Sequence, residues 1–201
     1  VGGLALSSNV TGNYNTAIGT SALYTNTAGS NNVAIGRQAL FCNTASDNTA
    51  VGFLALRNNT TGTYNSSLGC RALCSNTTGT NNTAIGNNAL FYNVGGSSNV
   101  AVGRDALLKN LSSRNTAIGT SALQCNTTGT YNTALGFEAL RYSTASNNTA
   151  IGTCALKYNT TGNANTAVGR LSSQRISAGA NNTSVGHFSL GYNTAGNNNT
   201  A

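Results

Sequence analysis

The chain has 201 residues, including 33 Asn, 29 Thr and 24 Gly, and it contains no Pro, Met or Trp. Three residues are acidic, one is His, and the formal net charge is +7. Since the side chains that usually serve in catalysis and metal binding are scarce, we expect no enzyme, no cofactor and no metal centre. No apolar run approaches the roughly 18 residues of a membrane-spanning helix, so the chain is not expected to be embedded in a membrane.

A repeat organises the whole sequence. An aliphatic-Gly pair recurs every 16 or 17 residues within the consensus N-T-A-Φ-G-x-x-A-L-x-x-N-T-T/A-G-x-x, where Φ is aliphatic. Eleven full repeats occupy residues 15–198. We therefore expect residues 1–201 to form one array of about 12 coils, cut from a longer fibre.

The period predicts an all-β fold, a parallel β-solenoid (β-roll) of 16–17-residue coils. Two packed helices need roughly 33 residues or more, whereas 17 residues can hold two short strands and two turns. In the first full repeat these are a strand at 16–18, a turn after it, a second short strand around 22–23 and a turn near 26–29, and later repeats follow the same order to residue 198. Three repeats have 16 residues, and each loses its residue in the second turn, where a solenoid tolerates it.

Alternation along a strand predicts the core. Side chains two residues apart lie on the same side of a strand, which suggests that the aliphatic residue before each Gly points inward beside the repeat Leu. The predicted core ladder is Ile18, Ile35, Val51, Leu68, Ile85, Val102, Ile118, Leu135, Ile151, Val168 and Val185, with Leu23, Leu40, Leu56, Leu73 and Leu90.

Each coil would bury only two large apolar side chains. Their burial contributes little free energy compared with the conformational entropy lost when the coil becomes ordered. We therefore expect ladders of Asn and Thr that hydrogen-bond along the rod, and several chains packed side by side. The repeat at 165–181 departs from the consensus, because Ser173 replaces the Leu and Leu171 and Ile176 are unexpected. Either this coil changes register or it carries a local binding feature.

Basic and aromatic residues recur at two outer positions of the repeat. Arg37, Arg71 and Arg104 follow the repeat Gly, and Arg57, Arg141 and Lys157 follow the repeat Leu beside Tyr24, Tyr142 and Tyr158. Two basic stripes with aromatic side chains could bind an anionic cell-surface glycan or receptor. The alternative is that the charges keep the rod soluble and that the rings form a rim between neighbouring chains. No specific nucleic-acid partner is expected.

The Thr of the N-T-A segment suggests an ice-binding solenoid as a further alternative, which would need a flat, exposed Thr array. The alternation argument directs this column inward instead, and Val33, Ser66 and Val100 interrupt it. Its members are Thr16, Thr49, Thr83, Thr116, Thr133, Thr149, Thr166 and Thr183.

The segments 15–29 and 115–129 carry a resemblance most clearly, reading N-T-A-I-G-T-S-A-L followed by N-T-A-G or N-T-T-G. This pattern resembles the heads of trimeric autotransporter adhesins and, more closely, the arrays of phage and large-virus tail-fibre-like proteins and bacterial surface proteins. The resemblance implies a homotrimeric β-roll, left-handed in the adhesin heads, that can extend into a longer filament. It also implies an extracellular structural shaft, on a virion or a cell surface, that presents an adhesive or receptor-binding end.

Overall fold

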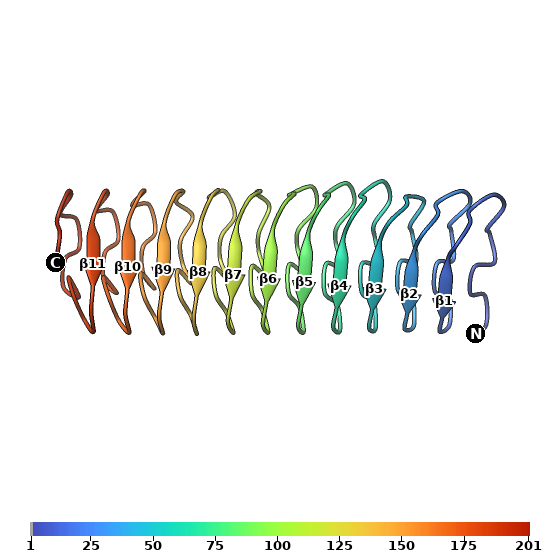
Figure 1. Cartoon of the computed structure of the whole chain (residues 1–201), viewed down its shortest axis with the longest axis horizontal. Coiled ribbons are helices and arrows are strands. Elements are labelled where there is room, and N and C mark those ends of the chain that lie inside the picture. The colour runs from blue at the N-terminus through green and yellow to red at the C-terminus, as the bar shows by residue number, and fades with distance from the viewer. Residues whose placement is uncertain (1) are drawn as a thin grey trace.

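The computed structural model describes residues 2–201, which form one parallel β-solenoid, as the sequence predicts (Figure 1). Each coil contributes one strand of three residues, and each strand pairs only with those of the adjacent coils. The strands of the described part are β1 (Thr16–Ile18), β2 (Val33–Ile35), β3 (Thr49–Val51), β4 (Ser66–Leu68), β5 (Thr83–Ile85), β6 (Val100–Val102), β7 (Thr116–Ile118), β8 (Thr133–Leu135), β9 (Thr149–Ile151), β10 (Thr166–Val168) and β11 (Thr183–Val185).

Equivalent residues stay in register along the rod, including across the shorter repeats. Val33 pairs with Thr49 across a 16-residue repeat, just as Thr16 pairs with Val33 across a 17-residue repeat. The missing residue is absorbed in the second turn. The Asn43 amide there donates to the carbonyl two residues on (2.7 Å), whereas Asn59 donates to the carbonyl three residues on (2.8 Å).

The second strand that the sequence predicts is absent, because the Ala-Leu segment turns instead of extending. Leu40 and Gln38 have φ values of 51° and 56°, in the left-handed region, and the same two positions are left-handed in every coil. Backbone bonds still join this segment between coils, for example from Leu23 N to the Ala39 carbonyl (3.0 Å). A third left-handed position comes directly before the Asn of the N-T-A segment, as Asn81 (φ of 57°) does before Asn82. None of these positions holds Thr, Val or Ile, since a β-branched side chain is the least tolerant of this conformation.

The repeat Leu is the main core residue, as predicted. Leu23, Leu40, Leu56, Leu73 and Leu90 have no exposed surface, and the remaining repeat Leu residues up to Leu156 are equally buried. The Ala before each Leu and the middle residue of β2 to β11, Ala or Ser, complete the interior.

The prediction that the aliphatic strand column lines the core is wrong. These residues point out of the coil: Ile118 is 39 % exposed, Leu68 50 % and Val185 61 %. The column comprises Ile18, Ile35, Val51, Leu68, Ile85, Val102, Ile118, Leu135, Ile151, Val168 and Val185, and each is partly or largely exposed. The Thr column lies on the same outer side, so the expectation that it points inward is also wrong. The reason is the narrowness of the coil, in which the inward residue of each strand is Ala or Ser and packs with the Leu segment.

Two internal ladders of Asn replace a wider apolar core. In the first, both the backbone N–H and the side-chain amide of Asn82 donate to Asn65 Oδ1 (3.0 and 3.1 Å), and the amide also reaches the Gly96 carbonyl (2.8 Å). In the second, Asn76 donates to Asn59 Oδ1 (2.8 Å) and to the carbonyl that closes its own turn. The predicted ladders are therefore confirmed for Asn, and buried amides that pair with one another add specificity to a thin core, although the buried Asn26 Oδ1 has no partner.

The divergent repeat keeps its register, since β10 pairs residue for residue with β9 and β11. Instead, two of its core residues differ from the consensus. Ser173 takes the place of the Leu, and Ile176 takes the place of a ladder Asn and has no exposed surface. The Oγ atoms of Ser172 and Ser173 each lie 2.6 Å from Ser184 Oγ, which satisfies the buried hydroxyls. The larger Ile176 therefore compensates for the volume lost at Ser173, and the register of the coil does not change.

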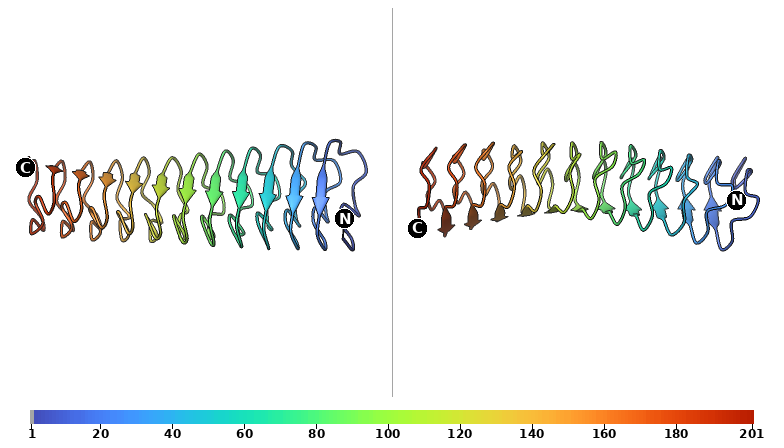
Figure 2. Two further views of the ribbon diagram at one scale, coloured as in Figure 1. Left: turned by 60° about the horizontal axis from the view of Figure 1, so that its bottom comes forward. Right: turned by 90° about the horizontal axis from the view of Figure 1, so that it is seen from above.

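The strands lie along one side of the rod and turn gradually about its axis from β1 to β11, as the two views of Figure 2 show. Progressive twist is the normal tendency of stacked strands. The sheet is therefore a narrow strip that twists about the axis of the rod.

Leu107 tests the left-handed core position, because it is fully buried and has a φ of 50°. Replacing it with Ile keeps the volume but places a branched Cβ in the left-handed region, whereas Met is unbranched there. We expect L107I to lower the free energy of unfolding by about 1–2 kcal/mol more than L107M. Urea unfolding followed by circular dichroism measures both. Equal losses in the two variants would contradict this backbone assignment.

Candidate functional site

The outward side chains of the strands form a continuous surface, here called the strand face. It consists of the first and third residues of β1 to β11, which are Thr, Val or Ser and an aliphatic residue, respectively. None of these side chains is charged. With strands in register about 4.8 Å apart, the aliphatic residues form one unbroken column along the rod.

The strand face exposes aliphatic side chains at the same position of successive coils. Seven of its aliphatic residues are at least 37 % exposed: Ile18, Leu68, Ile85, Ile118, Leu135, Ile151 and Val185. Contiguous exposed apolar patches usually mark an interaction site. This face is therefore one candidate functional surface.

A second candidate surface, here called the second wall, carries the two residues that follow each repeat Leu. Tyr24 stacks on Phe41 with ring centroids 5.1 Å apart, and the guanidinium of Arg57 lies 5.4 Å from the Phe41 centroid. Tyr142 stacks on Tyr158 at 5.6 Å. Because adjacent coils are close together, their rings stack and cover part of each other's surface. Each such contact stabilises the fold modestly.

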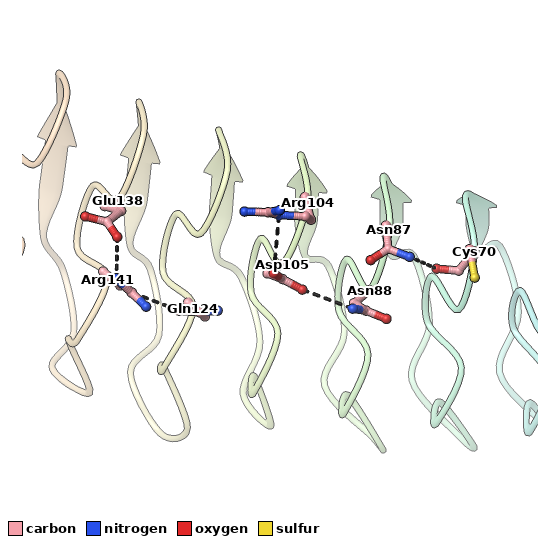
Figure 3. A network of polar contacts seen from close by, with 8 residues as sticks. All are labelled: Cys70, Asn87, Asn88, Arg104, Asp105, Gln124, Glu138 and Arg141. Carbon is pink, nitrogen blue, oxygen red and sulfur yellow. Dashed lines mark hydrogen bonds and ion pairs between the residues drawn. The ribbon is translucent and has the colours of Figure 1, made fainter.

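Glu138 lies beside the second wall, two residues before the repeat Leu140, and organises the most polar part of that wall. It accepts from Arg141 Nη1 of the same coil and pairs with Lys157 Nζ of the next coil at 2.6 Å, and Arg141 Nε also donates to Gln124 Oε1 (2.8 Å; Figure 3). Burial of Glu138 opposes its ionisation, but the hydrogen bond and charge of Lys157, together with Arg141, outweigh burial and lower the pKa of Glu138. The hydrogen bond to Glu138 raises the pKa of Lys157 above its ordinary value. One carboxylate thus pairs with two cations, and the cluster keeps a net charge of +1.

A smaller polar group lies two coils away along the same side. Asp105 accepts from Asn88 (3.1 Å), which belongs to the preceding coil, and pairs loosely with Arg104 at 3.6 Å (Figure 3). The Arg104 side chain is 67 % exposed, so this pair adds little stability.

The basic residues expected to form two stripes are spread out. Arg37, Arg71 and Arg104 follow β2, β4 and β6, so each lies two coils from the next, roughly 10 Å at the coil spacing. The Arg37 guanidinium lies 5.7 Å from the Phe53 centroid. On the second wall, Arg141 and Lys157 come together with Tyr142 and Tyr158, whereas Arg57 lies near Tyr24 through Phe41. The predicted residues therefore make two local clusters and not continuous stripes.

Sequence reasoning missed several residues on or beside the second wall. Glu138 and Gln124 hold the Arg141 cluster, and Arg175 lies 5.5 Å over the ring of Tyr192. The repeat alignment could have indicated Arg175, since it occupies the column of Tyr142, Tyr158 and Tyr192.

The remaining chemistry-bearing residues form no site in residues 2–201. The five cysteines are free thiols, and burial raises the pKa values of Cys74 and Cys154, which disfavours the reactive thiolate. In the same residues no three His, Cys, Asp or Glu side chains gather as metal ligands. No helix among them is long and apolar enough to cross a membrane.

Comparisons with known proteins add no family assignment: no family model, curated protein or solved structure matches the chain.

Glu138→Gln tests the ion cluster through its pH dependence. Because the folded-state pKa of Glu138 is lowered, its ionised form stabilises the fold above the unfolded-state value of about 4.3. This contribution is lost as the pH falls through the lower folded-state pKa. Lys157 stays charged at pH 7 and at pH 2, the two values compared below.

We expect E138Q to reduce the free energy of unfolding by on the order of 1 kcal/mol at pH 7 and the difference to close near pH 2. Denaturant unfolding at the two pH values measures it. The control is Asp105→Asn, which removes the more exposed pair and should change stability less. A deficit in E138Q that is the same at both pH values would contradict the ionic origin.

Proposed function

We propose that the chain is a shaft segment of a homotrimeric fibre, in which the strand face is the contact between chains. The observation that carries this proposal is the unbroken, uncharged aliphatic column on a rod whose own core has only one Leu per coil. The role is mechanical: the shaft extends and presents an adhesive or receptor-binding end. This role requires no catalytic residue.

Burying the column would supply the apolar contact that the single chain lacks. Each coil would add one more buried aliphatic side chain, at about 25 cal/mol per Å² of apolar surface removed from water. The resemblance of the repeats to trimeric fibre proteins implies three copies, and closed cyclic symmetry is the usual arrangement of such homo-oligomers. Since the strip twists about each rod, chains that follow it would wind about a common axis.

Stacked coils suit a load-bearing shaft. Each coil contacts its neighbours through backbone bonds and paired Asn amides, so the structure can lengthen by adding coils without changing any contact. This architecture supports an extracellular location on a virion or cell surface, where rigid extension places a binding end at a distance. A cell-surface glycan or receptor would then be the partner of that end.

The trimer is tested by placing charge on the strand face. We expect the unaltered chain to sediment as three copies of 20.3 kDa, about 61 kDa, and the double variant I85E/I118E to sediment as single chains. The two glutamates that each copy would place in the contact would have to be desolvated. Sedimentation equilibrium at several concentrations measures the mass.

The matched control is T61E/T161E, which adds the same charge at exposed turn positions outside the strand face. It should keep the mass of the unaltered chain. Circular dichroism and a thermal melt of each variant report whether the coils are still folded. A single-chain mass for the unaltered protein, or an intact trimer in folded I85E/I118E, would refute the proposal.

Ice binding is the second candidate, and the outward Thr column favours it. Thr83, Thr116 and Thr149 are among the residues of the exposed strand face, contrary to the alternation argument. The gradual turning of the strands counts against a flat lattice match (Figure 2), which makes the fibre the preferred function. Thermal hysteresis by the monomeric chain, lost in T116L/T149L but not in T61L/T161L, would support ice binding. Its absence would exclude that function.

A further inference from the structure

A groove of about 500 Å³ opens on the second wall between the coils of β9, β10 and β11. Its lining residues are Tyr158, Gln174, Arg175, Ser177 and Thr194. None of them belongs to the strand face. Whatever occupies the groove therefore need not compete with the proposed contact between chains.

The groove exists because a column of rings is interrupted by Arg175. Tyr142, Tyr158, Arg175 and Tyr192 occupy the same position in four successive coils. Tyr142 stacks on Tyr158 with an interplanar angle of 8°, whereas the Arg175 guanidinium packs toward Tyr192, 5.5 Å from its centroid. The side of the Tyr158 ring that faces away from Tyr142 therefore borders the opening, and Tyr158 remains 44 % exposed.

Lys157 leaves this side of the ring open as well. Its ammonium lies 5.2 Å from the Tyr158 centroid but bonds to Glu138, which belongs to the coil that carries Tyr142. The positive charge of Lys157 is thus directed to the stacked side, where a carboxylate already pairs with it. The groove itself retains the charge of Arg175.

Polar groups that have no protein partner surround the open ring. The side-chain amide of Gln174, the guanidinium of Arg175 and the hydroxyl of Thr194 make no hydrogen bond within residues 2–201. Ser177 Oγ donates to the Thr194 carbonyl at 3.2 Å and keeps its acceptor capacity. An aromatic face, one cation, one amide and two hydroxyls therefore converge within one groove.

Charge favours an anionic occupant. The three acidic residues of the chain are Asp47, Asp105 and Glu138, and none follows residue 138. Arg170 and Arg175 therefore lie in coils that lack any carboxylate side chain. An anion entering the groove meets no competing carboxylate on the coils of β9 to β11.

We propose that this groove binds an acidic saccharide. A pyranose ring would lie on the exposed side of Tyr158, its carboxylate would accept from the Arg175 guanidinium, and its hydroxyls would bond with Gln174, Ser177 and Thr194. A guanidinium recognises a carboxylate through two parallel hydrogen bonds, and an aromatic face accepts the apolar side of a sugar ring. The internal exchange of Ser173 and Ile176 keeps this coil in register while its outer residues form the site.

The test uses tetragalacturonate as the probe and its methyl ester as the matched ligand, because the ester keeps the rings and removes the charge. Isothermal titration calorimetry with the folded chain should show saturable binding of the acid and at least tenfold weaker binding of the ester. Arg175→Gln should weaken binding of the acid at least tenfold, and Tyr158→Leu should weaken both ligands.

The control variant is Arg37→Gln, since Arg37 also lies over a ring, that of Phe53 at 5.7 Å, but outside the groove. It should change the affinity by less than twofold. No saturable binding, equal affinity for acid and ester, or equal losses in R37Q and R175Q would overturn the proposal. Sedimentation of the same samples reports chain association separately, so failure of the groove and failure of the fibre are distinguishable.

Discussion

The paired Asn amides inside the coil are the interaction on which the rest of the structure depends. Along the first ladder, the side-chain oxygen of one Asn accepts the backbone N–H of the next, whose amide reaches a turn carbonyl, as Asn82 does with Asn65 and Gly96. Leaving any of these groups unpaired in the interior would cost about 1–3 kcal/mol per group. The ladders therefore fix the register of every coil against the next. They also occupy interior space that a wider solenoid fills with aliphatic side chains.

A narrow interior decides which residues face outward. Once the two Asn columns and the repeat Leu are inside, only Ala or Ser fits at the inward strand position, as Ala84 and Ser184 illustrate. Glycine after each strand meets a different constraint, the close approach of the next coil, because a Cβ on Gly86 would lie 2.7 Å from the Gly103 carbonyl carbon. The aliphatic residues are then left on the surface. The apolar strand face thus follows from the polar core.

The repeat period, the single array and the parallel solenoid could all be predicted from the sequence, because they depend on spacing alone. The direction of the strand side chains could not be predicted from alternation, since alternation gives two faces and does not say which is inside. The signal that decides it is the uniformly small middle residue, Ala17, Ala34 and their equivalents, between variable neighbours such as Val33 and Ile35. The left-handed conformation of the repeat Leu was hidden because this position holds Leu, or Ser173 in the divergent repeat, and never the Gly or Asn that usually signals such a conformation. The groove could not be predicted, since it depends on which ring Arg175 packs against.

Two outer surfaces are candidates for function, and each suits a different role. The strand face offers a continuous apolar contact suited to identical chains, while the second wall offers local clusters that vary from coil to coil. The most direct test of this account is small-angle X-ray scattering of the unaltered chain, which gives mass and maximum dimension together. Chains joined along the strand face predict about 61 kDa, three times 20.3 kDa, with a maximum dimension close to one rod of about 55–60 Å. A mass of one chain, or a dimension that grows with mass because rods join end to end, would contradict it.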